Sequence, residues 1–277
     1  MYVPDITFVV FTFNEAARLP NVLCNFQGYG PILIVDNYST DATVAIAREA
    51  GCSVLMNKNQ GWVEDYETTE NVKAAVSTEW IYWGFADEIA PKEVLSNLAQ
   101  VIKERRHDII MIQRKNYLYG QFCHDVAVSN HIKAFKKEAI DFQGNTIHNF
   151  GRVLVKEERI YKMTSDKFVH HLISNTAESY LNTINRYTDM EIVTKSATEI
   201  DQPIVYYLLL PLKVLWWEFF RGGGRISGKP ALALSVFMLI YSLIKAIKAY
   251  EVLEELDSTN ITVANERIVR SLLEKFP

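Results

Sequence analysis

The chain has 277 residues, of which 49% are hydrophobic and 22% charged, so it is long enough to fold as a large globular domain with a buried core. Its formal net charge of -4 at pH 7 gives no overall basic field, which argues against a nucleic-acid polymer as partner. The 3 cysteines are scattered, which argues against a disulfide framework or a zinc site and favours a reducing compartment. No signal peptide is visible at the N-terminus, so we expect a cytoplasmic protein.

Strand and helix patterns alternate through the first part of the chain. The β-branched and aromatic residues at 6–11 predict a first strand, and the apolar run at 32–36 predicts a strand that is buried on both faces. Further strands are expected at 53–56, 80–85 and 108–113, and helices at 15–26, 41–50 with Gly51 as its end, 62–76 and 92–105. This alternation predicts a parallel sheet with helices on both faces.

Polar side chains follow three of these strands, where each strand ends. Asn14 comes after the first strand, Asp36 ends the second, and Asp87 follows the fourth. Because the carboxyl ends of parallel strands meet at one edge of a sheet, we expect these side chains to share a ligand site. An ordinary strand-to-helix turn, with residues 39–41 capping the next helix, is the alternative interpretation of the Asp36 segment.

The pattern changes after residue 113. Short alternating pieces at 131–135 and 152–155 predict antiparallel strands beside the parallel half, and a helix is expected at 177–194. Residues 203–220 and 231–244 are apolar runs, and residues 251–276 are typical of a solvated helix. We therefore expect one domain at 1–200 and an apolar helical region at 201–277.

The apolar region does not contain a clear run of about 20 apolar residues, the length that spans a bilayer. The first run is interrupted by Pro211, Lys213 and Glu218, and the second ends at Lys245 and Lys248. Aromatic pairs beside basic residues are typical of helices that lie in the headgroup region of a membrane. A buried helical pair, a dimer interface and a spanning hairpin are the alternatives.

Three stretches carry a resemblance to a known family. They are Phe-Thr-Phe-Asn-Glu at 11–15, Val-Asp-Asn-Tyr-Ser-Thr-Asp-Ala-Thr at 35–43, and the strand at 80–85 with the Ala-Asp-Glu that follows it. In this order and spacing, the sequence resembles family 2 glycosyltransferases with the GT-A fold, and it is similar to bacterial lipopolysaccharide-core β-glucosyltransferases. The resemblance implies a mostly parallel, Rossmann-like sheet with an antiparallel insert, followed here by the apolar helices.

The resemblance also implies a function. It points to an inverting, metal-dependent hexosyltransferase that takes a sugar from a nucleotide-diphosphate donor, with UDP as the expected nucleotide. The acceptor would be a glycan or a lipid-linked molecule of bacterial cell-surface polysaccharide or lipopolysaccharide synthesis, at the inner face of the cell membrane. A catalytically degenerate nucleotide-binding scaffold is the alternative. A nucleotidyltransferase is disfavoured, because residues 12–19 contain no glycine-rich phosphate loop.

The family pattern assigns roles to particular residues. Asp87 and Glu88 are the expected catalytic carboxylates, and Asp87 with His171 would bind Mg²⁺ or Mn²⁺, which accept such ligands. The expected donor-binding residues are Thr12, Phe13, Asn14, Glu15, Asp36, Ser39, Asp41, Trp62, Asn71, Ala86 and His148.

Three features of this pattern leave alternatives open. Phe85 stands where the family usually has an aspartate, which is expected to weaken donor or metal binding. Glu88 is one candidate for the general base, although it could equally orient the loop, and Asp125 and Asp166 are unassigned candidates. A structural role is the alternative to metal binding for the pair formed by residues 170 and 171.

Overall fold

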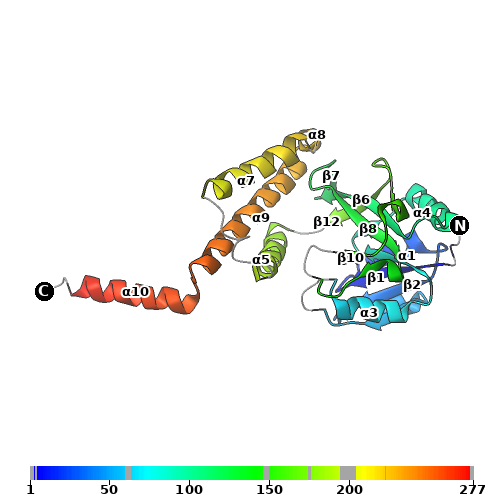
Figure 1. Ribbon diagram of the computed structural model, residues 1–277, viewed down its shortest axis with the longest axis horizontal. Helices are drawn as coiled ribbons and strands as arrows, with labels where there is room; N and C mark the ends of the chain where they lie inside the picture. Colours follow the sequence, from blue (N-terminus) through cyan, green and yellow to red (C-terminus); the bar gives the residue numbers. More distant parts are fainter. Residues whose placement is uncertain are drawn as a thin grey trace. The chain divides into compact units, whose positions relative to one another are not determined.

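The computed structural model describes residues 3, 5–59, 64–145, 150–173, 176–193, 204–221 and 223–274. The chain divides into two compact units, which are shown as a ribbon in Figure 1. The first comprises Met1–Asn175 and Glu218–Leu234, and the second comprises Thr176–Trp217 and Ser235–Pro277. The division therefore differs from a single boundary at residue 200, because the chain returns to the first unit after Trp217.

The first unit opens with alternating strands and helices. These are β1 (Ile6–Thr12), α1 (Leu19–Phe26), β2 (Ile32–Asp36), α2 (Thr43–Glu49), β3 (Ser53–Met56), α3 (Tyr66–Ala75), β4 (Trp80–Phe85) and α4 (Lys92–Glu104). Strands β3, β2, β1 and β4 lie side by side in this order and are all parallel. The predicted parallel half of the sheet is confirmed.

Short strands and two longer ones extend the sheet beyond β4. They are β5 (Glu88–Ile89), β6 (Ile109–Leu118), β7 (Gln121–Phe122), β8 (Ser129–Lys136), β11 (Ile160–Lys162) and β12 (Phe168–Ile173), with the 3-10 turns η1 (Lys137–Ala139) and η2 (Glu157–Arg159) between them. The main order is β3-β2-β1-β4-β8-β6-β12-β5, and β8 is antiparallel to both β4 and β6. Strands β9 (Ile140–Asp141) and β10 (Arg152–Val153) form a separate pair. This confirms the antiparallel insert and the predicted α/β fold class.

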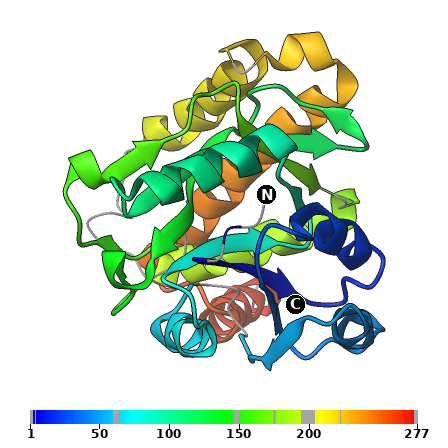
Figure 2. The ribbon, with the colours of Figure 1, turned by 90° about the vertical axis from the view of Figure 1, so that its right-hand side faces the viewer.

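Apolar side chains cover both faces of the sheet. On one face, Phe8 of β1 stacks on Phe26 of α1 with ring centroids 4.6 Å apart, in a cluster that also contains residues of α4. On the other face, Trp83 of β4 packs among aromatic residues and against α3. Figure 2 shows the ribbon from a second direction. Helices on both faces leave the ends of the strands as the place where polar loops meet.

The end of α2 follows the prediction, whereas its start differs. Gly51 has φ +76°, its N–H donates to Arg48 O, and Cys52 N–H donates to Ala47 O, which is the hydrogen-bond pattern of a Schellman cap. At the other end, Ala42 is the N-cap residue, without a side-chain hydrogen bond. The Asp41 carboxylate instead accepts from Thr43 N at 2.9 Å.

The second unit is helical. Its elements are α5 (Ala177–Val193), α7 (Ile204–Trp216), the part of α9 (Lys229–Leu253) from residue 235 on, and α10 (Ser258–Leu273). The π-helical turn η3 (Trp217–Arg221) and α8 (Gly224–Ser227) follow α7 in the chain. As predicted, the described residues of α10 are all exposed to solvent.

The apolar helices continue past residues that interrupt the apolar runs of the sequence. Helix α7 continues through Pro211, and α9 continues beyond Lys245 and Lys248. Both lysines form ion pairs with α5: Lys245 with Glu191, and Lys248 with Asp189 at 2.6 Å. Lysine is a good helix former, so neither residue ends the helix. Among the described residues, α9 alone is long and apolar enough to cross a membrane, with a mean hydropathy of 1.9 over its best window, of which 22% is buried.

Candidate active site

Hydrogen bonds join the loops that follow β1 and β2. Asn14 N donates to Ser39 Oγ at 2.8 Å, and Thr40 N donates to Asn14 Oδ1 at 2.8 Å. Ala16 N donates to Asp41 Oδ2 at 3.1 Å. Asn14 has φ +56°, a left-handed conformation that asparagine tolerates better than most residues. The structure thus brings Asn14, Ser39 and Asp41 together at the carboxyl edge of the sheet.

Asp36 is completely buried at the base of this edge. One carboxylate oxygen accepts from Ser39 N at 2.7 Å, and the other accepts from Ser39 Oγ at 2.6 Å and from Thr12 Oγ1 at 2.8 Å. Three donors satisfy the hydrogen-bonding needs of this buried carboxyl group without a solvent contact. The hydrogen bonds of Asp36 therefore fix the conformation of the loop that carries Ser39.

The other expected donor-binding residues occupy different environments. Glu15 forms a two-pronged ion pair with Arg18, with atoms 2.5 and 2.6 Å apart. Phe13 is 40% exposed, Asn71 donates to Asn57 Oδ1 at 3.0 Å near the end of β3, and Ala86 packs in the core. Trp62 and His148 lie outside the described residues.

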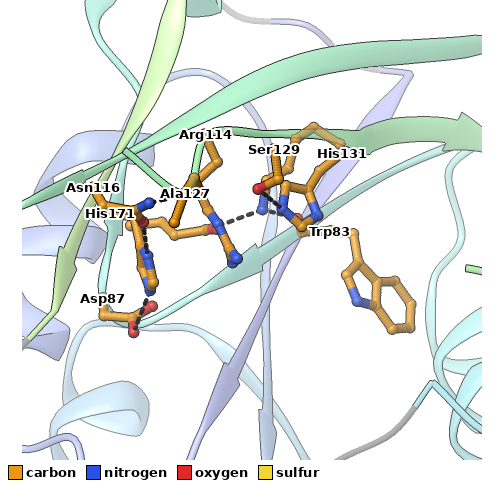
Figure 3. A network of polar contacts seen from close by, with 10 residues as sticks. Trp83, Asp87, Arg114, Asn116, Ala127, Ser129, His131 and His171 are labelled. Atoms are coloured by element: carbon orange, nitrogen blue, oxygen red, sulfur yellow. Dashed lines mark hydrogen bonds and ion pairs between the residues drawn. The ribbon is translucent and has the colours of Figure 1, made fainter. Parts of the chain in front are cut away.

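Asp87 and His171 face each other at the end of β4 (Figure 3), with 3.2 Å between Asp87 Oδ2 and His171 Nε2. The side-chain amide of Asn116 donates to Val126 O at 3.1 Å and to Ala127 O at 2.8 Å. Its oxygen must therefore face His171 Nδ1, 2.7 Å away, and we infer that Nδ1 carries a proton. In a neutral ring, Nε2 then presents a lone pair to the carboxylate. Two acceptors at this distance require a proton or a cation between them.

Asp87 lies beside His171, Arg18 and Arg114. Burial alone would raise the pKa of Asp87, but His171, when its ring is protonated, and the charges of Arg18 and Arg114 hold the pKa of that carboxyl well below its usual range. The carboxylate is therefore charged at neutral pH, which is the state that ligates a cation.

Glu88 lies in a buried ion pair instead of facing the site. Its Oε2 is 2.5 Å from Nζ of Lys133, its Oε1 is 3.5 Å from a guanidinium nitrogen of Arg114, and Glu88 and Lys133 are each 1% exposed. Lys133 also donates to Trp83 O at 3.1 Å and lies 5.1 Å from the centre of the Phe85 ring. A carboxylate held in this way is not available to take a proton from an acceptor hydroxyl. The geometry argues against the expectation that Glu88 is the general base and supports its alternative role in orienting the loop.

His131 lies beside the same cations. Burial, followed by the charges of Arg114 and Lys133, lowers the pKa of His131 to about 2, so its ring is neutral. Its Nε2 and the Ser129 hydroxyl are 2.6 Å apart (Figure 3). His131 therefore contributes no positive charge to the site.

The pair formed by Asp87 and His171 fits a divalent cation. Cis ligands at about 2.1 Å from an octahedral ion lie about 3 Å apart, close to the observed separation of 3.2 Å. Among the described residues, no group of three or more His, Cys, Asp or Glu side chains could hold a metal. Further ligands would come from bound phosphate and water, as is usual for Mg²⁺. The neighbouring His170 is 2.8 Å from the Tyr117 hydroxyl and belongs to the aromatic packing.

Sequence reasoning missed several residues of this site. These are Arg18, Arg114, Asn116, His131 and Lys133. Four of them lie on β6 and β8, which carry no recognisable motif. Residues 113–116 are four polar residues in succession, a pattern that does not identify the residues that β6 places near Asp87.

The sequence matches a known family over its first part. The family model described as Glycosyl transferase family 2 matches residues 7–152. The glycosyltransferase SunS of Bacillus subtilis is 30% identical over 102 residues, 36% of this chain and 24% of SunS, so the match spans about a quarter of that relative. An uncharacterized glycosyltransferase of Rickettsia typhi is 21% identical over 97% of this chain and 95% of its own length.

Solved structures resemble the chain more distantly. The crystal structure of Staphylococcus aureus TarS 1-349 in complex with UDP-GlcNAc is 16% identical, covers 91% of this chain and 90% of TarS 1-349, and has a TM-score of 0.44. The family match carries the identification, since it includes β1 to β4 and all the motifs that end these strands. The chain belongs to glycosyl transferase family 2.

Proposed function

We propose that the chain is an inverting, metal-dependent hexosyltransferase that uses a UDP-linked sugar as donor. The acceptor would be a glycan or a lipid-linked molecule in bacterial cell-surface polysaccharide or lipopolysaccharide synthesis. The observation that carries the proposal is the pairing of Asp87 Oδ2 with His171 Nε2 at 3.2 Å, beside the loops that follow β1 and β2. A charged carboxylate next to a ring nitrogen can hold a divalent cation. Such a cation would bind the diphosphate end of a nucleotide sugar.

The nucleoside would bind at the loops after β1 and β2. The side chains proposed for this part of the donor site are Thr12, Phe13, Asn14, Glu15, Asp36, Ser39, Asp41 and Asn71. Phe13 is exposed and offers a face for the base, while Asn14 and Asp41 offer polar groups at the same edge. Because Asp36 is buried, we assign it a positioning role, in which it acts on the ligand through Ser39.

The diphosphate would bind beside Asp87, through a divalent cation. Asp87 and His171 would hold Mg²⁺ or Mn²⁺, and a bound ion would neutralise the charge that develops on the leaving diphosphate. Arg18 and Arg114 both act on the charge of Asp87 and add positive potential at the same place. Arg114 Nε is buried and has no hydrogen-bond partner in the described part of the chain, so that guanidinium has capacity for a phosphate oxygen.

The second unit supports the proposed location at the inner face of the membrane. Leu209, Leu212, Trp216 and Trp217 on and after α7 are each at least 50% exposed, and Lys213 lies among them. Large apolar and aromatic side chains beside a lysine are typical of a helix in the headgroup region of a membrane. We expect the full chain to sediment with vesicles that contain phosphatidylglycerol. A chain that stays in the supernatant at low salt would contradict this part of the proposal.

A screen of UDP-sugars tests the proposed activity. The purified full chain is incubated with each donor and Mn²⁺, and the release of UDP is measured. At least one UDP-sugar should be hydrolysed, and the reaction should stop in EDTA. The variant Glu157→Ala is a suitable control, because Glu157 is exposed and pairs only with Lys162 among the described ion pairs. Binding of UDP without any turnover would favour the alternative of a non-catalytic scaffold.

A further inference from the structure

The chain returns to the first unit after Trp217 and packs on the loop between β7 and β8. We call residues 218–221 and 223–224 the return segment. Glu218 Oε2 accepts a hydrogen bond from Ala127 N at 2.5 Å. Gly224 is buried, and a Cβ at this position would lie 2.9 Å from Phe219 Cδ2, 3.0 Å from Phe219 Cα and 3.0 Å from Val126 Cγ2. Packing within the return segment and against the loop therefore favours glycine at 224, and the contact with Ala127 is made by a side-chain carboxyl group.

The loop that receives the return segment has an unusual backbone. His124 has φ +50° and Ala127 has φ +52°, a left-handed conformation that is uncommon for residues other than glycine. Such conformations persist when the surroundings hold them. Both polar backbone groups of Ala127 are held: its N–H donates to Glu218, and its carbonyl accepts from Asn116 Nδ2 at 2.8 Å.

These contacts continue to the cation site. Asn116 is 4% exposed, and because its amide nitrogen is occupied by Val126 O and Ala127 O, its oxygen is directed at His171. The 2.7 Å contact between Asn116 Oδ1 and His171 Nδ1 fixes the tautomer and the orientation of the ring, and thereby turns Nε2 toward Asp87 (Figure 3).

We propose that Asn116 and Glu218 are positioning residues of the cation site, and that the return segment completes this site from the C-terminal part of the chain. The proposal rests on the cation site of the proposed function. Glu218 accepts a hydrogen bond from Ala127 N, and Ala127 O accepts one from the side-chain amide of Asn116. The oxygen of that amide in turn contacts His171 Nδ1 and orients the ring. Partners in the shell behind a metal ligand commonly change metal affinity by about 10- to 100-fold.

Binding of Mn²⁺ in the presence of UDP tests the proposal without measuring turnover. Electron paramagnetic resonance gives the free Mn²⁺ in a titration of the full chain. The Asn116→Leu variant should bind Mn²⁺ about tenfold more weakly or worse, and Glu218→Ala roughly three- to tenfold more weakly. Glu218→Gln should bind nearly as the unaltered chain does, because its amide oxygen can still accept from Ala127 N. Glu157→Ala is again the control for loss of a surface carboxylate.

Thermal unfolding of each variant separates a local effect from a loss of fold. If Asn116→Leu fails to fold, the Mn²⁺ affinities of Glu218→Ala, Glu218→Gln and Glu157→Ala still test the proposal, because Glu218 lies outside the loop and contacts it through Ala127 N. Equal Mn²⁺ affinity in Glu218→Ala and the unaltered chain would overturn the role of the return segment while leaving the proposed function intact. Absence of Mn²⁺ binding by the unaltered chain would overturn both.

Discussion

Replacing Asp87 with asparagine is expected to lower kcat by about a thousandfold or more with the fold unchanged. Asparagine has nearly the same shape but no charge, so a bound cation would lose its carboxylate ligand, and the leaving diphosphate would lose the charge stabilisation that this cation supplies. A metal commonly supplies several kcal/mol of charge stabilisation, and about 4 kcal/mol corresponds to a factor of a thousand in rate. Steady-state release of UDP from the best donor measures the effect.

The control for this variant is Asp5→Asn, because Asp5 is an exposed aspartate of the same unit. It should keep the activity of the unaltered chain. Unfolding curves should show that Asp87→Asn is folded, since Asp87 loses only its contacts with positive groups at the site. Turnover in Asp87→Asn within a factor of ten of the unaltered chain would contradict the assignment of Asp87 as a cation ligand.

The variant Lys133→Met should be destabilised by about 3 to 5 kcal/mol, because it leaves Glu88 buried without its closest cation. Lys133 Nζ is 2.5 Å from Glu88 Oε2, and both side chains are almost inaccessible to water. Methionine fills a similar volume, so the loss of charge is the main change. Urea unfolding followed by near-ultraviolet circular dichroism and tryptophan fluorescence measures the effect, with Trp80 and Trp83 in the unit that contains this pair.

A double variant isolates the contribution of the charge. Combining Lys133→Met with Glu88→Gln removes both charges and should restore a large part of the lost stability, because no uncompensated carboxylate remains. If the single variant Lys133→Met unfolds at the same urea concentration as the unaltered chain, Glu88 is not anchored by this pair. The general-base role would then return to consideration for Glu88.

The fold was predictable because its signals are local. The apolar run at 32–36 ends in Asp36, and Asp87 follows the aromatic strand at 80–85, while parallel strands bring such ends to one edge. Gly51 predicted the end of a helix for a backbone reason that holds in the structure. Helix α9 was less predictable, because Lys245 and Lys248 end an apolar pattern in the sequence, yet are paired with residues of α5 that lie more than 50 positions earlier.

The site was predictable only in part, because the signals in the sequence are local and most contacts of the site are not. The motifs identified Asp87, whereas its environment depends on pairs that are distant in sequence, such as His171 with Asn116 and Lys133 with Glu88. Glu88 follows Asp87 directly, but it enters β5 and its side chain joins the buried pair. Phe85, where the family usually has an aspartate, lies over Lys133, a contact that no local pattern shows.

Calorimetric titration of the full chain with UDP, in Mn²⁺ and again in EDTA, tests the central claim most directly. If Asp87 and His171 hold a cation that bridges to the diphosphate, UDP should bind in Mn²⁺, and EDTA should weaken binding by about tenfold or more, which is 1.4 kcal/mol. Equal affinity in the two conditions, or no binding in either, would contradict a metal-dependent donor site built on Asp87 and His171.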